Sequence, residues 1–129
     1  MIDTAKLRSH IAGWRPSFEE QLAALVEIPT VSMDPGRRSE MDRCAEVAKQ
    51  LLTEVGARVD IIETAGNPMV LGRVTRDPSF PTVTIYNHLD VQPAEALEWQ
   101  TPPFSFTRDG DRYFARGSTD DKLRNRQGA

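Results

Sequence analysis

The sequence has little of several features that would assign it quickly to a class. Among 129 residues it holds one cysteine, Cys44, which excludes an internal disulfide and favours a reducing, cytoplasmic location. The first residues, MIDTAKLRSH, lack the apolar core of a signal peptide, and no apolar run approaches the length of a membrane span. Sixteen Lys and Arg against nineteen Asp and Glu leave a net charge of −3, so we expect no nucleic-acid or membrane partner.

What is present is the composition of a folded domain, with 39% hydrophobic and 27% charged residues. In SFEEQLAALVEI the apolar residues recur at three- and four-residue steps, which predicts a helix. Ser17 and Glu20 have the spacing of a capping box at its start, and Pro29 ends it. Pro16 either separates this helix from one before it or kinks a single helix.

A second helix is predicted over SEMDRCAEVAKQLLTEVG, residues 39–56. Ser39 and Asp42 resemble a capping box, and Gly56 stands where a C-terminal cap belongs. The expected buried stripe of this helix is Met41, Ala45, Ala48, Leu52 and Val55, with Cys44 and Leu51 beside it. Cys44 is therefore expected to act as a small buried hydrophobic residue.

The pattern then changes from helical to extended. Short β-branched runs at 58–63, 69–74 and 82–87 predict strands, and the last has apolar residues on both faces, as a central strand would. Residues 104–116 predict a hairpin with Asp-Gly at its turn, positions 109–110. Helices followed by sheet strands predict an α/β layer fold.

The end of the third predicted strand carries the first candidate site. In a strand, residues two apart point to the same face, so His88 and Asp90 are expected to project together. An imidazole beside a carboxylate suits a metal ligand with its orienting partner, or a general base with its partner. The alternative is a hydrogen-bonded pair with a structural role alone.

The second candidate site is ARGSTDDK. Adjacent Asp120 and Asp121 repel each other, and a nearby cation would relieve the cost. Gly117 permits a tight turn before them. The alternative is a solvated acidic turn balanced by Arg116 and Lys122.

Together these segments resemble a known family. Five pieces match its pattern in order, namely LVEIPTVS (25–32), GNPMVLG (66–72), YNHLDVQPA (86–94), EWQTPPF (98–104) and DGDRYFARGSTDDK (109–122). The family is that of the aminoacylase, carnosinase and glutamate-carboxypeptidase dinuclear zinc peptidases, and the dipeptidase branch is the most similar. The resemblance implies a zinc-peptidase-like fold of α/β/α layers with a mixed sheet.

The resemblance also implies roles for three residues. His88 would bind one zinc ion, Asp90 would orient that histidine, and Asp120 would bridge two zinc ions. The peptide bond after Asp120, which leads to Asp121, would be cis. The implied reaction is metal-dependent hydrolysis of peptide or amide bonds in small peptide substrates.

The sequence departs from the family after Lys122. Leu123 replaces an expected glycine, residues 123–129 form a divergent polar tail, and no glutamate follows Glu98 to act as general base. We therefore expect residues 1–122 to form an N-terminal part of a catalytic domain, followed by a truncated or frame-shifted tail. A catalytic zinc usually has three protein ligands, so weak or absent zinc binding and no activity of the chain alone are expected. The alternative is a non-catalytic fragment, or a metal-binding or interaction module.

Overall fold

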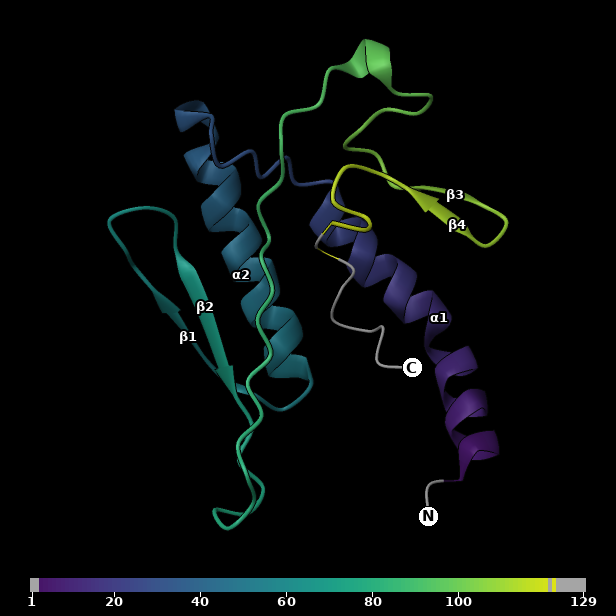
Figure 1. Cartoon of the computed structure of the whole chain (residues 1–129), viewed down its shortest axis with the longest axis vertical. Coiled ribbons are helices and arrows are strands. Elements are labelled where there is room, and N and C mark those ends of the chain that lie inside the picture. The colour runs from purple at the N-terminus through teal and green to yellow at the C-terminus, as the bar shows by residue number, and fades with distance from the viewer. Residues whose placement is uncertain (1–2, 121, 123–129) are drawn as a thin grey trace.

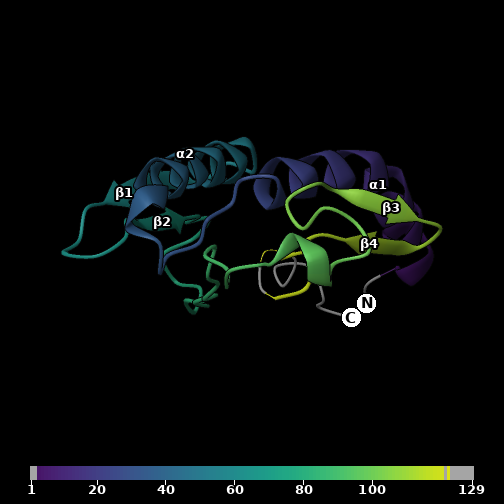
Figure 2. The ribbon, with the colours of Figure 1, turned by 90° about the horizontal axis from the view of Figure 1, so that it is seen from above.

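The computed structural model describes residues 3–120 and 122 (Figure 1). The elements are α1 (Thr4–Val26), α2 (Arg38–Glu54), β1 (Arg58–Ile62), β2 (Met69–Arg73), β3 (Thr107–Asp109) and β4 (Arg112–Phe114). Short 3-10 turns lie at Pro35–Arg37 and Ala96–Glu98. Seen from above, α1 and α2 lie along one layer and the two hairpins lie beneath them (Figure 2).

The first helix is longer than the sequence pattern indicates. It begins after Asp3, whose carboxylate accepts hydrogen bonds from two backbone N–H groups of the first turn, and it continues through Pro16. The predicted capping box of Ser17 and Glu20 is therefore wrong, because both residues lie inside the helix. Proline removes one helical hydrogen bond without ending this helix. Among the described residues, no helix is both long and apolar enough to cross a membrane.

The second helix agrees with its predicted range but not with its predicted start. Ser39 donates to Glu40 instead of capping, and Asp42 pairs with Arg38 at 3.0 Å, so the predicted capping box is wrong. The predicted C-terminal cap is confirmed. Gly56 has φ +85°, where a side chain would be strained, and two backbone hydrogen bonds close the Schellman turn around it.

The strands predicted at 58–63 and 69–74 are confirmed as β1 and β2, which form an antiparallel hairpin that packs against α2. Gly72 lets the hairpin approach α2 closely, since a Cβ at this position would lie 3.2 Å from the Leu52 side chain. The buried residues of this unit are Met41, Cys44, Ala45, Ala48 and Ala57. Cys44 is buried as predicted, whereas Val55 is exposed and does not extend the buried stripe.

The predicted hairpin at 104–116 is also confirmed, as β3 and β4. Its two turn residues are Gly110, with φ +58°, and Asp111, one position later than the predicted pair. The apolar side of the hairpin packs on α1, where Phe106, Tyr113 and Ala115 contact Phe18, Leu22 and Val26.

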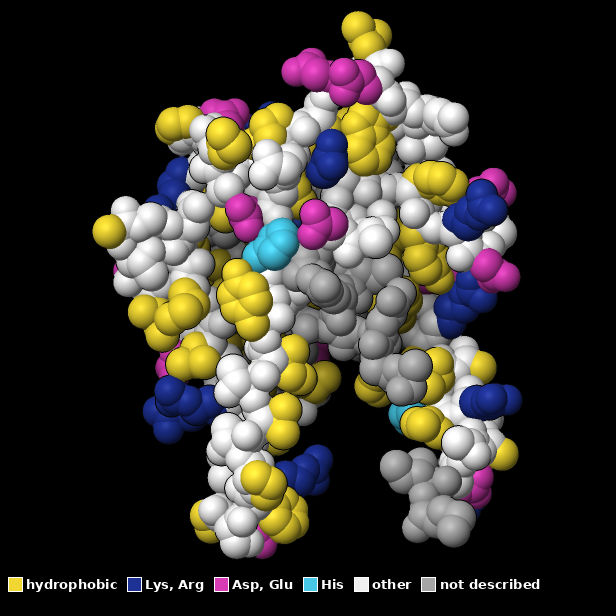
Figure 3. All heavy atoms as spheres, viewed as in Figure 1, with side chains coloured by type: hydrophobic (Ala, Val, Ile, Leu, Met, Phe, Trp, Pro, Cys, Tyr) yellow, Lys and Arg dark blue, Asp and Glu magenta, His cyan; other side chains and the backbone are white. Residues whose placement is uncertain are grey.

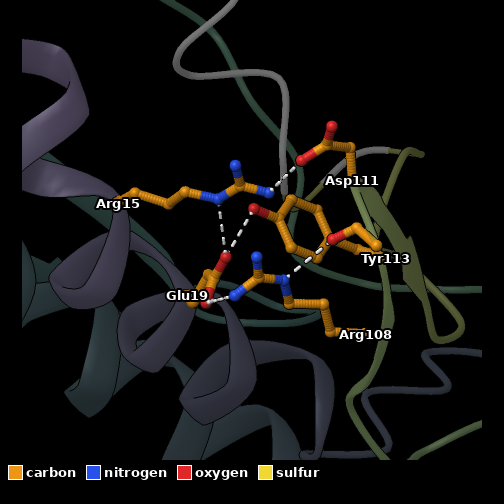
Figure 4. A network of polar contacts seen from close by, with 6 residues as sticks. Arg15, Glu19, Arg108, Asp111 and Tyr113 are labelled. Atoms are coloured by element: carbon orange, nitrogen blue, oxygen red, sulfur yellow. Dashed lines mark hydrogen bonds and ion pairs between the residues drawn. The ribbon is translucent and has the colours of Figure 1, made fainter.

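A polar network at the edge of this apolar contact also ties the hairpin to α1 (Figure 4). Glu19 accepts hydrogen bonds from the Tyr113 hydroxyl at 2.9 Å, from Arg15 at 3.0 Å and from Arg108 at 3.1 Å. Arg15 also donates to Asp111 at 2.8 Å. The hydrogen bonds from Tyr113 and Arg15 hold the pKa of Glu19 below its usual value.

The α/β class is confirmed, in the form of a partial domain with two small antiparallel sheets. The predicted strand at 82–87 is wrong, since this segment pairs with no described strand. Its side chains Val83, Ile85 and Tyr86 are 81%, 78% and 83% exposed. The one isolated bridge among the described residues joins Val31 and Val91 in parallel.

Candidate metal centre

The candidate centre begins at His88, which follows the exposed extended segment. The Nδ1 atom of His88 lies 3.3 Å from Oδ1 of Asp90 and 3.1 Å from the Asp90 backbone oxygen. Both of these oxygens are acceptors, so the imidazole proton belongs on Nδ1. The neutral ring then carries its lone pair on Nε2, which is the form in which histidine binds a metal ion.

The Nε2 atom of His88 faces the second candidate segment. It lies 3.6 Å from Oδ1 of Asp120, although 32 residues separate the two in the chain. This distance exceeds that of a hydrogen bond, and it is near the roughly 3.3 Å that separates two ligands of a tetrahedral zinc ion with bonds of about 2.0 to 2.1 Å. The donor pair therefore fits one divalent cation. Figure 3 shows a histidine between two acidic side chains on this face.

A short connector after α1, residues 28–32, supports the histidine side of the centre. Ser32 donates from Oγ to Oδ2 of Asp90 at 2.6 Å, and Thr30 donates from Oγ1 to the Leu89 carbonyl at 2.6 Å. The backbone N–H of Val91 in turn donates to the Thr30 carbonyl at 2.9 Å. Because Asp90 contacts Nδ1 of His88, these bonds also support the position of the imidazole.

The turn before Asp120 requires a glycine. Gly117 has φ +88°, and a Cβ at this position would lie 2.9 Å from Cγ1 of Val91 and 3.1 Å from Cδ of Lys122. The turn is closed by the backbone N–H of Lys122, which donates to the Gly117 carbonyl at 3.1 Å. Gly117 thus allows the segment of Asp120 to pack against the segment of His88.

Lys122 is buried with its charge inside the protein. Its Nζ donates to the carbonyls of Leu25 at 2.8 Å and Ile28 at 3.0 Å, at the C-terminal end of α1. Burial lowers the pKa of Lys122, while Cys44 and Asp90 act in the opposite direction. Burial also raises the pKa of the Cys44 thiol, which keeps it neutral.

The structure brings all three predicted site residues, His88, Asp90 and Asp120, into one place. Their roles as ligands and orienting group remain predictions. Among residues 3–120 and 122 no cluster of three or more His, Cys, Asp or Glu side chains forms a complete metal site. The prediction of a cis bond depends on Asp121, which lies outside the described residues.

The sequence interpretation missed the supporting residues. Thr30 and Ser32 contact positions 58 and 59 residues away, and no local spacing reports such a contact. The only available signal was their place in LVEIPTVS, one of the five segments that match the family pattern.

Comparisons with known proteins relate the chain to a class of metal-dependent peptidases. The model of Peptidase family M20/M25/M40 matches residues 84–124, which include His88, Asp90 and Asp120. The Cys-Gly metallodipeptidase dug1 of Schizosaccharomyces pombe is 37% identical over 91% of this chain. The Beta-Ala-His dipeptidase of Rattus norvegicus is 32% identical over 91% of it.

Two solved structures are similar in fold. The dipeptidase Dug1p of Saccharomyces cerevisiae superposes with a TM-score of 0.79 over 87% of this chain, at 33% identity. Human carnosine dipeptidase 1 superposes with a TM-score of 0.79 over 92% of this chain, at 32% identity. The predicted family is therefore confirmed, and the chain is related to the metal-dependent dipeptidases of family M20. It spans about a quarter of the length of these relatives, between 26% and 28%.

Proposed function

We propose that this chain carries half of a dipeptidase metal site, in which His88 and Asp120 are ligands of a zinc ion. The observation that carries the proposal is the 3.6 Å separation between Nε2 of His88 and Oδ1 of Asp120. Nitrogen and carboxylate donors are typical zinc ligands. Asp90 is proposed to orient His88 by holding the proton on Nδ1.

The proposed reaction is hydrolysis of a small peptide, the substrate class that the names of the relatives indicate. When bound, the metal would activate water and polarise the scissile carbonyl. The residues of this chain would hold and orient the ion. A hollow of about 250 Å³, lined by Trp99 and by residues 113–120, offers space for a small ligand.

We propose further that the chain alone has weak zinc affinity and no peptidase turnover. It contributes one histidine and one carboxylate, whereas a catalytic zinc usually has three protein ligands. No glutamate follows Glu98 to accept the proton of the attacking water. A second candidate function, a metal-binding or interaction module without hydrolysis, is favoured by the exposed apolar segment at 82–87.

Calorimetric titration of the full chain with zinc tests the proposed ligands. We expect weak binding with one ion per chain, and its loss in both His88→Ala and Asp120→Asn. The matched control is His10→Ala, which removes the other histidine of the chain, a residue on α1 beside Trp14. Equal binding by wild type and His88→Ala would refute the proposal, and dipeptide turnover by the purified chain would refute its inactivity.

A further inference from the structure

We propose that Arg116 and Lys122 are positioning residues that anchor the chain before and after Asp120 and thereby place Asp120 opposite His88. The inference rests on the proposed function, since it assigns a purpose to that placement. Each cation donates to backbone carbonyls of a different part of the chain. Arg116 contacts the segment that follows His88, and Lys122 contacts the end of α1 and the residues just after it.

Asp120 needs such anchors because it is not held by packing of its own. Its side chain is 89% exposed. An exposed carboxylate keeps a defined position only if the backbone around it is fixed. The side chains that flank it are therefore the place to look for what sets its distance from His88.

Lys122 forms the first anchor, two residues after Asp120. Its ammonium is buried and donates to two carbonyls, those of Leu25 and Ile28. Leu25 lies in the last turn of α1, where the helix end carries partial negative charge and suits a cation, and Ile28 follows two residues after the helix. Removing the ammonium would leave these carbonyls without that donor, and the segment would lose its tie to α1.

Arg116 forms the second anchor, four residues before Asp120. Its Nη2 atom donates to the Pro93 carbonyl at 3.3 Å, and its guanidinium lies 4.8 Å from the centre of the Trp99 ring. Its backbone N–H donates to the Pro103 carbonyl at 2.6 Å. Because Pro93 follows His88 by five residues, Arg116 links the segment of one proposed ligand to the segment of the other.

The test compares Lys122→Met and Arg116→Gln with wild type, in the full chain and first without metal. The readout is ¹⁵N relaxation of the backbone amides of residues 117–120. We expect order parameters near 0.85 in wild type to fall below about 0.6 in either variant, while the amides of α2 and β1 stay unchanged. The matched controls are Lys6→Met and Arg112→Gln, which remove exposed cations of the same kinds.

The second readout is zinc affinity, which we expect to fall about tenfold or more in both anchor variants, as for other residues that orient metal ligands. If Lys122→Met does not fold, Arg116→Gln decides alone. Rigid amides in the variants, or loosened amides with wild-type zinc affinity, would overturn the inference. If wild type itself binds no zinc, the proposed function fails, and the anchors are then judged by the relaxation data.

Discussion

Two β-branched segments of this chain have opposite environments. In the 28–32 connector, Ile28 is 1% exposed and Thr30 is fully buried. In the segment 82–87, Ile85 is 78% exposed, and no described strand pairs with it. The two segments are similar in residue type, so composition does not explain the difference.

The difference comes from the neighbours that each segment finds. The connector is enclosed by α1, by Val91 and by the Lys122 side chain, all of which this chain supplies. A strand with two apolar faces needs a neighbour on each edge and a cover on each face. The described residues thus support the segment of His88 through contacts from the connector, but they supply no strand that pairs with the segment 82–87.

The largest expected effect is a difference in the free energy of unfolding between alanine variants of Ile28 and Ile85. Ile28→Ala removes buried methyl groups and leaves a cavity, so we expect the free energy of unfolding to fall by about 2 to 5 kcal/mol. Ile85→Ala, the matched change in the exposed segment, should alter it by less than about 0.5 kcal/mol. Urea denaturation of both variants measures this. Equal losses would show that the segment 82–87 is packed in solution and would break the comparison.

A smaller loss of stability is expected from valine substitutions at Thr30, in the connector, and Thr84, in the segment 82–87. Thr30→Val keeps the shape of the side chain but leaves the Leu89 carbonyl without its 2.6 Å hydrogen bond, at an expected cost of about 1 to 3 kcal/mol. Thr84→Val, at an exposed position, should be close to neutral. The same urea experiment applies. A neutral Thr30→Val would mean that this hydrogen bond does not hold the connector to the segment of His88.

The smallest expected effect concerns the exposed network between α1 and the second hairpin. Folding lowers the pKa of Glu19, so its contribution to stability is present above its usual value of 4.5 and is lost as pH falls below it. Glu19→Gln should therefore lower stability at about pH 7 and reduce the further loss between about pH 5 and pH 3. Denaturation midpoints across this range measure it, with Glu20→Gln as the control. An unchanged pH dependence in Glu19→Gln would exclude this contribution.

The sequence predicted elements whose signals are local. Gly110 of the second hairpin and Gly56 after α2 each have a positive φ that glycine adopts readily, and both lie in turns, although the hairpin turn is one position later than predicted. The capping boxes failed because serine and an acid three residues apart also occur inside helices. The strand at 82–87 failed because its pattern reports an environment that the described chain does not provide.

The candidate site could also be predicted only where its signals are local in the sequence. A strand period predicted that His88 and Asp90 lie together, and the family resemblance added Asp120. His88 and Asp90 do contact each other, although the described residues form no strand there. The residues that hold them, among them Thr30, Ser32 and Lys122, act through contacts distant in sequence. Such contacts follow from packing and have no signature in local spacing.

The most direct test of the central claim follows the two histidines of the chain by NMR during zinc addition. Because the chain contains only His10 and His88, each ring nitrogen can be assigned and one histidine serves as the control for the other. We predict that Nε2 of His88 shifts as a metal-bound nitrogen while the ring of His10 stays unchanged. Zinc-dependent shifts at His10 alone, or at neither ring, would contradict the assignment of His88 as a metal ligand.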